Sequence, residues 1–264
     1  MLLLIDIGNT NTITGFYDKA VRNVLRLSTT MEGRGIDEYS SVLKDYIILH
    51  QMERPVGAVL CSVVPQATPL FVEAVRRSFG FEPMNVSHNL RTGLKFCIKN
   101  PDELGADRVA NAVAARNLYK GHLIVIDFGT ATTFSVVSSG GEYKGGSIMP
   151  GLKISADTLA DKTAKLPKVE LKSPVKAVGC DTESNILSGL ILGHAGAVER
   201  IIKEIKLELS LDKDIKTGAG VVTDTNVIAT GGLADLVIPY IDGIKEINPL
   251  LTLEGLRIIY ELNA

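Results

Sequence analysis

Residues Leu123–Thr133 read LIVIDFGTATT, and Leu2–Thr12 repeat the same plan near the N-terminus as LLLIDIGNTNT. In both stretches a run of large apolar residues precedes Asp-apolar-Gly, and small hydroxyl and amide residues follow. The two stretches share an aspartate, a glycine and a threonine: Asp6 with Asp127, Gly8 with Gly129, and Thr12 with Thr133. The copies begin just under half a chain length apart, which indicates two halves of related structure.

An unbroken run of Leu, Ile and Val is typical of a strand that is buried on both faces of a sheet. The glycine after it permits a tight turn and a close approach of backbone to a ligand, and Thr and Asn offer short hydrogen-bonding groups. A single Asp-x-Gly after a strand is most often only a turn. Two copies, each followed by similar small polar residues, favour two hairpins that hold a polyphosphate between them, with the carboxylates binding its metal ion.

The composition is that of a soluble globular protein, with 45% hydrophobic and 22% charged residues among 264. The formal net charge of −2 argues against broad binding to nucleic acid or to an anionic membrane surface. No segment has the length and apolar character of a membrane span, and Asp6 interrupts the short N-terminal apolar run, so no signal peptide is expected. We expect a cytoplasmic protein that binds neither nucleic acid nor membranes.

The cysteines and histidines predict neither a disulfide framework nor a metal site. Cys61, Cys97 and Cys180 are odd in number and lack paired spacing. Cys61 lies inside an apolar run, where core packing is expected. The four histidines show no ligand spacing, and His194 is predicted to be a packing or surface residue of a long helix that begins at Thr182. That helix is expected either to pack in the core or to form a dimer face.

Periodicity along the chain divides it into residues 1–118 and residues 119–264. The first half alternates as β-β-β-α-β-α-β, with helices predicted over residues 38–52 and 68–79. The second half begins again with three strands, and GGSIMPG at residues 145–151 is predicted to be a rigid turn. These alternating elements predict an α/β fold of mixed sheets flanked by helices.

Just before the boundary, ELGADRVANAVAARNLYK predicts a helix from Ala106 to Leu118. Asp107 and Arg108 fall in its first turn, where backbone N–H groups point outward and the local potential is positive. An arginine at this place indicates an anion to be bound, whereas Asp107 could equally be an ordinary first-turn acid. We expect Asp107 to remain ionised, because the helix dipole favours a negative charge there.

Three separated signatures resemble the actin/hexokinase/Hsp70 ATPase superfold: a first phosphate hairpin at Asp6–Asn11, a second at Asp127–Thr130, and an adenosine-side glycine pair in Ala229–Gly232. Within that superfold, further stretches resemble type III pantothenate kinases over nearly the whole chain: Gly105–Arg108 with Asn111, Ser62–Pro65, and Gly145–Gly151. The resemblance implies two similar halves of ribonuclease H-like, actin-like ATPase fold, with a cleft between the halves.

This resemblance implies ATP-dependent phosphorylation of the primary hydroxyl of pantothenate, the first step toward coenzyme A, by a homodimer. It also implies Mg²⁺ and a monovalent cation, K⁺ or NH₄⁺. Asp107 is then the general base, Asp127 binds the monovalent cation, and Asp6 positions Mg²⁺ through water. Nucleotide contacts are expected from Asp6, Ile7, Gly8, Asn9, Thr10, Asn11, Thr12, Ile13 and Thr130. Pantothenate contacts are expected from Gly105, Ala106, Asp107, Arg108 and Thr182.

Two features of this assignment leave alternatives. Arg108 could pair with the pantothenate carboxylate or with phosphate oxygens. The family usually carries Tyr-Asp-Asn-Pro where this chain has Ile98–Pro101, so Ile98 replaces a phenol that contacts the substrate. Losing that hydroxyl could cost a hydrogen bond worth about 0.5–1.5 kcal/mol.

Two other functions are consistent with the same fold. One is a non-catalytic nucleotide-binding regulator, against which the retention of Asp6, Asp107 and Asp127 argues. The other is a kinase for a different small hydroxy or carboxylate substrate, such as a sugar or acetate. Kinases of that kind usually need longer chains with inserted substrate domains.

Overall fold

The computed structural model describes residues 1–29, 35–174, 176–211 and 225–264. They form two compact units. The first contains Met1–Asn117 together with Leu250–Ala264, and the second contains Leu118–Pro249. The C-terminal segment therefore belongs to the first unit, whereas we predicted it as part of residues 119–264. The reason is its packing, since Leu253, Leu256 and Ile259 are buried in the core of the first unit.

A five-stranded mixed sheet forms the first unit, in the order β3-β2-β1-β4-β5. Its central strand β1 runs antiparallel to β2 and parallel to β4. The apolar residues of β1 are all buried, as the unbroken run predicts for a strand covered on both faces. The strands are β1 (Leu2–Ile7), β2 (Asn11–Asp18), β3 (Ala20–Ser28), β4 (Gly57–Ser62) and β5 (Met84–Asn85).

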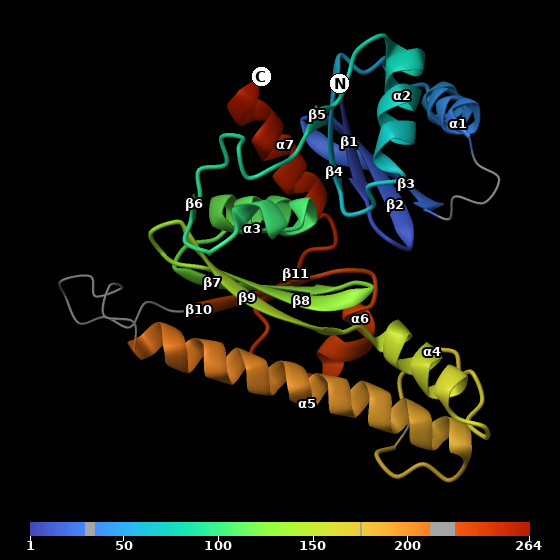
Figure 1. The fold of residues 1–264 in the computed structure, drawn as a ribbon, viewed down its shortest axis with the longest axis vertical. Coiled ribbons are helices and arrows are strands. Elements are labelled where there is room, and N and C mark those ends of the chain that lie inside the picture. Colours follow the sequence, from blue (N-terminus) through green and yellow to red (C-terminus); the bar gives the residue numbers. More distant parts are fainter. Residues whose placement is uncertain (30–34, 175, 212–224) are drawn as a thin grey trace. The chain divides into compact units, whose positions relative to one another are not determined.

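Helices cover both faces of this sheet (Figure 1). On one face, Leu3 and Ile5 of β1 pack in a cluster with residues of α1 and α2. On the other, Leu2 and Leu4 pack in a cluster with residues of α3 and α7. The helices are α1 (Ile36–Leu49), α2 (Thr68–Phe79), α3 (Ala106–Leu118) and α7 (Leu251–Asn263), with the short β6 (Lys95–Phe96) and a 3₁₀ turn (Pro101–Glu103) before α3.

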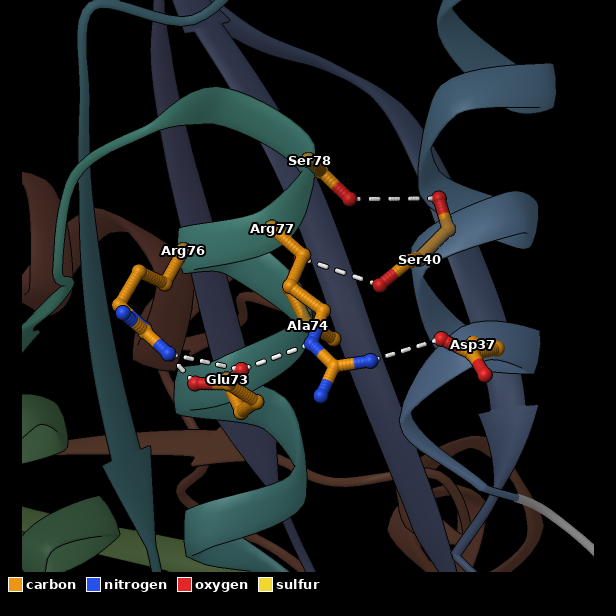
Figure 2. Close-up of polar contacts among 7 residues, drawn as sticks. All are labelled: Asp37, Ser40, Glu73, Ala74, Arg76, Arg77 and Ser78. Atoms are coloured by element: carbon orange, nitrogen blue, oxygen red, sulfur yellow. Dashed lines mark hydrogen bonds and ion pairs between the residues drawn. The ribbon is translucent and has the colours of Figure 1, made fainter.

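Polar contacts join α1 to α2 (Figure 2). The Ser40 hydroxyl donates to the Ala74 carbonyl at 3.3 Å, and the Ser78 hydroxyl donates to the Ser40 carbonyl at the same distance. Arg77 bridges the two helices, with Nη1 2.9 Å from Asp37 Oδ1 and Nε 2.7 Å from Glu73 Oε1. Hydrogen bonds from Arg76 and Arg77 lower the Glu73 pKa to about 2. These ion pairs are exposed, so each adds only modest stability, and the Arg77–Asp37 pair is the one that joins the two helices.

Five strands of the second unit repeat the sheet of the first, in the order β11-β10-β7-β8-β9. Its central β7 runs antiparallel to β8 and parallel to β10, as β1 does to β2 and β4. The long α5 packs along this sheet with α4 and α6 (Figure 1). The elements are β7 (His122–Phe128), β8 (Ala131–Val137), β9 (Glu142–Pro150), α4 (Leu152–Lys162), α5 (Thr182–Leu211), β10 (Thr225–Thr230), α6 (Ala234–Val237), a 3₁₀ turn (Ile238–Tyr240) and β11 (Glu246–Ile247).

Strand pairing corrects two details of the sequence interpretation. The first hairpin closes with Ile7 opposite Thr12, and the second closes with Phe128 opposite Thr132. The second turn is thus one residue shorter, so the structural counterpart of Thr12 is Thr132 and not Thr133. The predicted rigid turn at residues 145–151 is also wrong, because β9 continues through Pro150 in register with β8. Proline ends an edge of the ladder there, where its missing N–H is tolerated.

Candidate functional site

The first hairpin turn lies at the carboxyl end of β1. The Gly8 N–H donates to the Asn11 carbonyl at 3.0 Å and closes the turn. The Thr29 N–H donates to the Thr10 carbonyl at 3.0 Å, and the buried Thr12 and Thr29 hydroxyls are 3.0 Å apart. Exposed positions at the tip of the turn are Asn9 and Thr10. Hydrogen bonds therefore fix the base of the turn, and its exposed tip is accessible to a ligand.

Asp6 lies one position before the end of β1 and faces Cys61, for which the sequence predicted only a packing role. Asp6 is in register with Cys61 of the parallel strand β4. The Cys61 thiol donates to Asp6 Oδ1 with a sulfur–oxygen distance of 3.3 Å. Burial raises the pKa of this thiol well above its ordinary value, and the charges of Asp6 and Asp107 raise it further. Cys61 is thus a protonated thiol that donates to Asp6, and the charge of Asp107 also acts on it.

Asp107 occupies the first turn of α3, on the same face of the sheet as Cys61. Its Oδ1 accepts the Arg108 N–H at 2.7 Å. Burial raises the pKa of Asp107, while the Arg108 N–H and the Arg108 charge oppose that rise. Desolvation is the largest cause of this shift, and position in the first turn of a helix does not reveal it. A carboxylate with a raised pKa is a stronger proton acceptor, which suits a general base.

The glycine at residue 105 leaves room for the Asp107 carboxylate. A Cβ on Gly105 would lie 2.5 Å from Asp107 Oδ1 and 3.5 Å from Val63 Cγ1, so a side chain at residue 105 would displace the carboxylate. Val63 follows β4, and its N–H donates to the Ile7 carbonyl at 3.1 Å. The end of β4, the start of α3 and the first hairpin are thereby joined within the first unit.

The second hairpin turn is enclosed by two glycines from distant positions. A Cβ on Gly151 would lie 2.7 Å from the Gly129 carbonyl oxygen and nearer still to that of Thr130. Gly231 has a φ of 98°, and a Cβ there would lie 2.5 Å from both Asp127 Oδ1 and the Phe128 nitrogen. The glycine-bearing stretches at residues 145–151 and 229–232 therefore meet around this turn in the second unit. Thr130 is exposed at its tip.

The predicted pantothenate contacts lie in different units. Gly105, Ala106, Asp107 and Arg108 form one turn in the first unit. Thr182 is the exposed first residue of α5 in the second unit, after Asp181, whose Oδ1 accepts the Ser184 N–H at 2.7 Å. A joint contact of Thr182 and Arg108 with one substrate stays a prediction.

Contacts to Asp6 and to the second turn come from residues that no site prediction included. Cys61 reaches Asp6 through strand register, which an isolated sequence does not specify. Gly151 reaches Thr130 because β9 carries it back beside the turn. For Gly151, the glycine-rich GGSIMPG stretch was a usable signal, since glycine marks close backbone approach.

Neither a metal-binding cluster nor a membrane-spanning helix occurs among the residues that the structure describes. Across residues 1–29, 35–174, 176–211 and 225–264, no three side chains of His, Cys, Asp or Glu gather into a metal cluster. Within the same ranges, every helix is too short or too polar to cross a bilayer.

Two α/β halves with the same strand order, each with an Asp-x-Gly hairpin at the end of its central strand, define the actin-like ATPase fold. Two solved structures share this fold. One, from Campylobacter jejuni and provisionally described as a Baf family transcriptional activator, has a TM-score of 0.56 and 19% identity, covering 98% of this chain and 97% of that one. The other, from Sinorhizobium meliloti and provisionally described as a 2-dehydro-3-deoxygalactonokinase, has a TM-score of 0.51 and 12% identity, covering 99% and 96%.

Within this fold, the profile of type III pantothenate kinases matches residues 2–204. A type III pantothenate kinase from Anaeromyxobacter sp. (strain K) is 43% identical over 266 residues, and one from Moorella thermoacetica is 40% identical over 267 residues. Both alignments cover all of each chain. The chain belongs to the type III pantothenate kinase family, a family of kinases.

Proposed function

We propose that this protein transfers the γ-phosphoryl group of ATP to the primary hydroxyl of pantothenate, the first step toward coenzyme A. Family membership supports the reaction and both substrates. The observation that carries the residue assignment is the gathering of Asp6, Cys61 and Asp107 on one face of the first sheet. Two carboxylates there provide separate groups for a phosphate-bound metal ion and for a hydroxyl proton.

Asp107 is the general base of the proposed reaction. Phosphoryl transfer depends more on alignment and charge neutralisation than on covalent catalysis. As the substrate oxygen bonds to the γ-phosphorus and the bridging P–O bond of ATP breaks, the hydroxyl proton passes to Asp107. The absence of a side chain on Gly105 leaves room for the Asp107 carboxylate, and its raised pKa favours proton acceptance.

The two hairpin turns hold the nucleotide in this proposal. The first, from Asp6 to Ile13, lines the phosphates, and Thr130 of the second contacts the nucleotide. Backbone N–H groups and hydroxyls at open turn tips suit phosphate oxygens. The predicted cleft between the halves and the predicted homodimer stay predictions.

The residues present also fit the two cations. Mg²⁺ in kinase sites is held by one or two carboxylates, waters and substrate phosphates, so the single carboxylate of Asp6, near the end of β1, is consistent with such a site. When bound, Mg²⁺ would neutralise phosphate charge. Asp127 beside the second turn would hold K⁺ or NH₄⁺, and the tight packing of Gly231 against its carboxylate would fix that oxygen. Replacing K⁺ by Na⁺ should lower the rate of wild type and leave that of Asp127→Asn unchanged.

The primary test compares ADP release with ATP, Mg²⁺, K⁺ and pantothenate for wild type and Asp107→Asn. Loss of a general base should lower kcat by about 10²-fold or more, with pantothenate binding retained in calorimetry. Asp45→Asn, on the exposed side of α1, is the matched control and should keep wild-type kcat. An Asp107→Asn variant with wild-type kcat would refute the base assignment.

Other outcomes separate the alternative functions. Wild type that binds nucleotide without acting on pantothenate, sugars or acetate would be the non-catalytic regulator. Turnover of another hydroxy compound in a substrate panel would replace pantothenate. An Arg108→Ala variant distinguishes the two roles of that residue, because a raised KM for pantothenate alone indicates pairing with the substrate carboxylate.

A further inference from the structure

A buried histidine lies directly behind the second hairpin. His194 on α5 is 6% exposed, and its Nε2 lies 3.0 Å from Thr132 Oγ1 on β8. The His194 ring also lies beside Phe128, with 6.2 Å between ring centroids. Phe128 and Thr132 are the two residues that pair across the base of the turn. One imidazole therefore contacts both ends of the turn that carries Gly129 and Thr130.

The chemistry of this contact favours one fixed geometry. Burial lowers the pKa of His194, which favours the neutral ring. A neutral imidazole has one donor nitrogen and one acceptor nitrogen, and a threonine hydroxyl can complement either. Thr132 is 1% exposed, so its hydroxyl would be a buried polar group without this partner. His194 lies on the side of α5 that buries Ile191, Ala195 and Val198 against the sheet, which holds the ring in place.

The first hairpin provides an independent example of the same arrangement. Its structural counterpart of Thr132 is Thr12, which is fully buried and shares a 3.0 Å hydroxyl contact with Thr29. In each unit, the first buried residue after the turn is a threonine. Its hydroxyl lies within hydrogen-bond distance of a side chain from another segment of the chain. The partners are unrelated in sequence, since one is a threonine after β3 and the other a histidine of α5.

We propose that His194 is a positioning residue for the second hairpin, acting through Thr132 and Phe128 to hold the turn at Gly129 and Thr130 in its nucleotide-binding geometry. The proposal rests on the proposed role of Thr130 as a nucleotide contact. It predicts that His194 affects ATP binding although its side chain is buried behind the turn.

Four substitutions test this pairing by calorimetric titration with ATP. Removing the hydrogen bond in His194→Leu or Thr132→Val should weaken ATP binding about 3- to 10-fold, the range of one lost hydrogen bond. The KM for pantothenate should stay unchanged. His194→Gln can place a nitrogen near the Nε2 position, and Thr132→Ser keeps the hydroxyl, so both should restore most of the affinity. The double variant His194→Leu/Thr132→Val should be no weaker than the worse single variant, because both remove one interaction.

A matched control separates positioning from general stability. Ser135 is buried on the same strand, and its hydroxyl lies 3.1 Å from Tyr143 Oη, away from the turn. Ser135→Ala should lower the thermal midpoint while leaving ATP affinity at the wild-type value. Equal weakening by Ser135→Ala, or wild-type affinity in folded His194→Leu and Thr132→Val, would overturn the proposal.

Amide hydrogen exchange at residues 129–131 gives a second measurement that needs no ligand. Faster exchange in His194→Leu than in wild type supports positioning, and equal rates contradict it. If wild type fails to phosphorylate pantothenate, only the proposed function is refuted. Amide hydrogen exchange and ATP affinity still test the positioning role of His194.

Discussion

Replacing Gly151 by alanine should damage nucleotide use through steric contact alone. Gly151 precedes α4 with φ of −73° and ψ of 165°, an extended conformation that alanine adopts without strain. The added Cβ would lie 2.7 Å from the Gly129 carbonyl oxygen and nearer still to that of Thr130. Both atoms belong to the backbone, so no side-chain rotation relieves the contact. The second hairpin turn, the start of α4, or both must move.

The size of the effect follows from that distance. Contacts of this type become favourable only near 3.5 Å, so the turn must withdraw by roughly 1 Å. A misplacement of about 1 Å in a group that aligns substrate can cost on the order of 10²-fold in rate. We therefore expect Gly151→Ala to lower kcat/KM for ATP by about 10- to 100-fold. Overpacking should also lower the free energy of unfolding by about 1–3 kcal/mol.

Steady-state kinetics with varied ATP, together with urea unfolding, measure both effects. Gly140→Ala is the control, because Gly140 is exposed between β8 and β9 and its added Cβ would meet only Ser138 Oγ at 3.7 Å. That variant should match wild type in both assays. A folded Gly151→Ala enzyme with wild-type kcat/KM for ATP would show that the second turn does not position the nucleotide.

Three further predictions concern residues of the first unit, and Gly189 of α5 is the control for the first of them. Gly255→Ala should lower the free energy of unfolding in urea by about 1–3 kcal/mol, because its Cβ would clash with the Ala110 backbone; Gly189→Ala, with open space around it, should be neutral or stabilising by up to about 1 kcal/mol. Cys61 should react with iodoacetamide far more slowly than the two exposed cysteines, since it is buried and its pKa is raised; equal rates by mass spectrometry would contradict its geometry. The pKa of Glu73 is lowered from 4.5 to about 2. The stabilisation of the fold by the ionised Glu73 is therefore complete above pH 4.5 and is lost as the pH falls toward 2. The gap in thermal midpoint between wild type and Glu73→Gln should narrow over that range, and a constant gap would argue against the pairing.

Much of the fold was predictable because its signals are local. The apolar run of β1 predicted a doubly buried strand, and its five apolar residues are buried. The helix at Thr68–Phe79 has its predicted bounds, with Gly80 in a left-handed conformation at its end. The repeated Asp-x-Gly indicated two related halves, and the shared strand order confirms them.

Other features depend on contacts between distant residues. The last helix, α7, lay outside the predicted elements, and it joins the first unit because its apolar side packs with β1 and α3. A continuous β9 replaced the predicted turn at residues 145–151, because pairing with β8 outweighs the turn tendency of its glycines. The raised pKa of Asp107 reflects desolvation, which first-turn position alone could not indicate.

The sequence by itself determined the two Asp-x-Gly hairpins, the aspartate at the start of α3 and the family, because each is a property of neighbouring residues along the chain. Only the tertiary structure placed Cys61 against Asp6, Gly151 against Thr130 and His194 against Thr132. Each of these pairs is set by strand register or by helix packing over a sheet. Such contacts depend on which segments are buried together, and that is decided by the folded core as a whole.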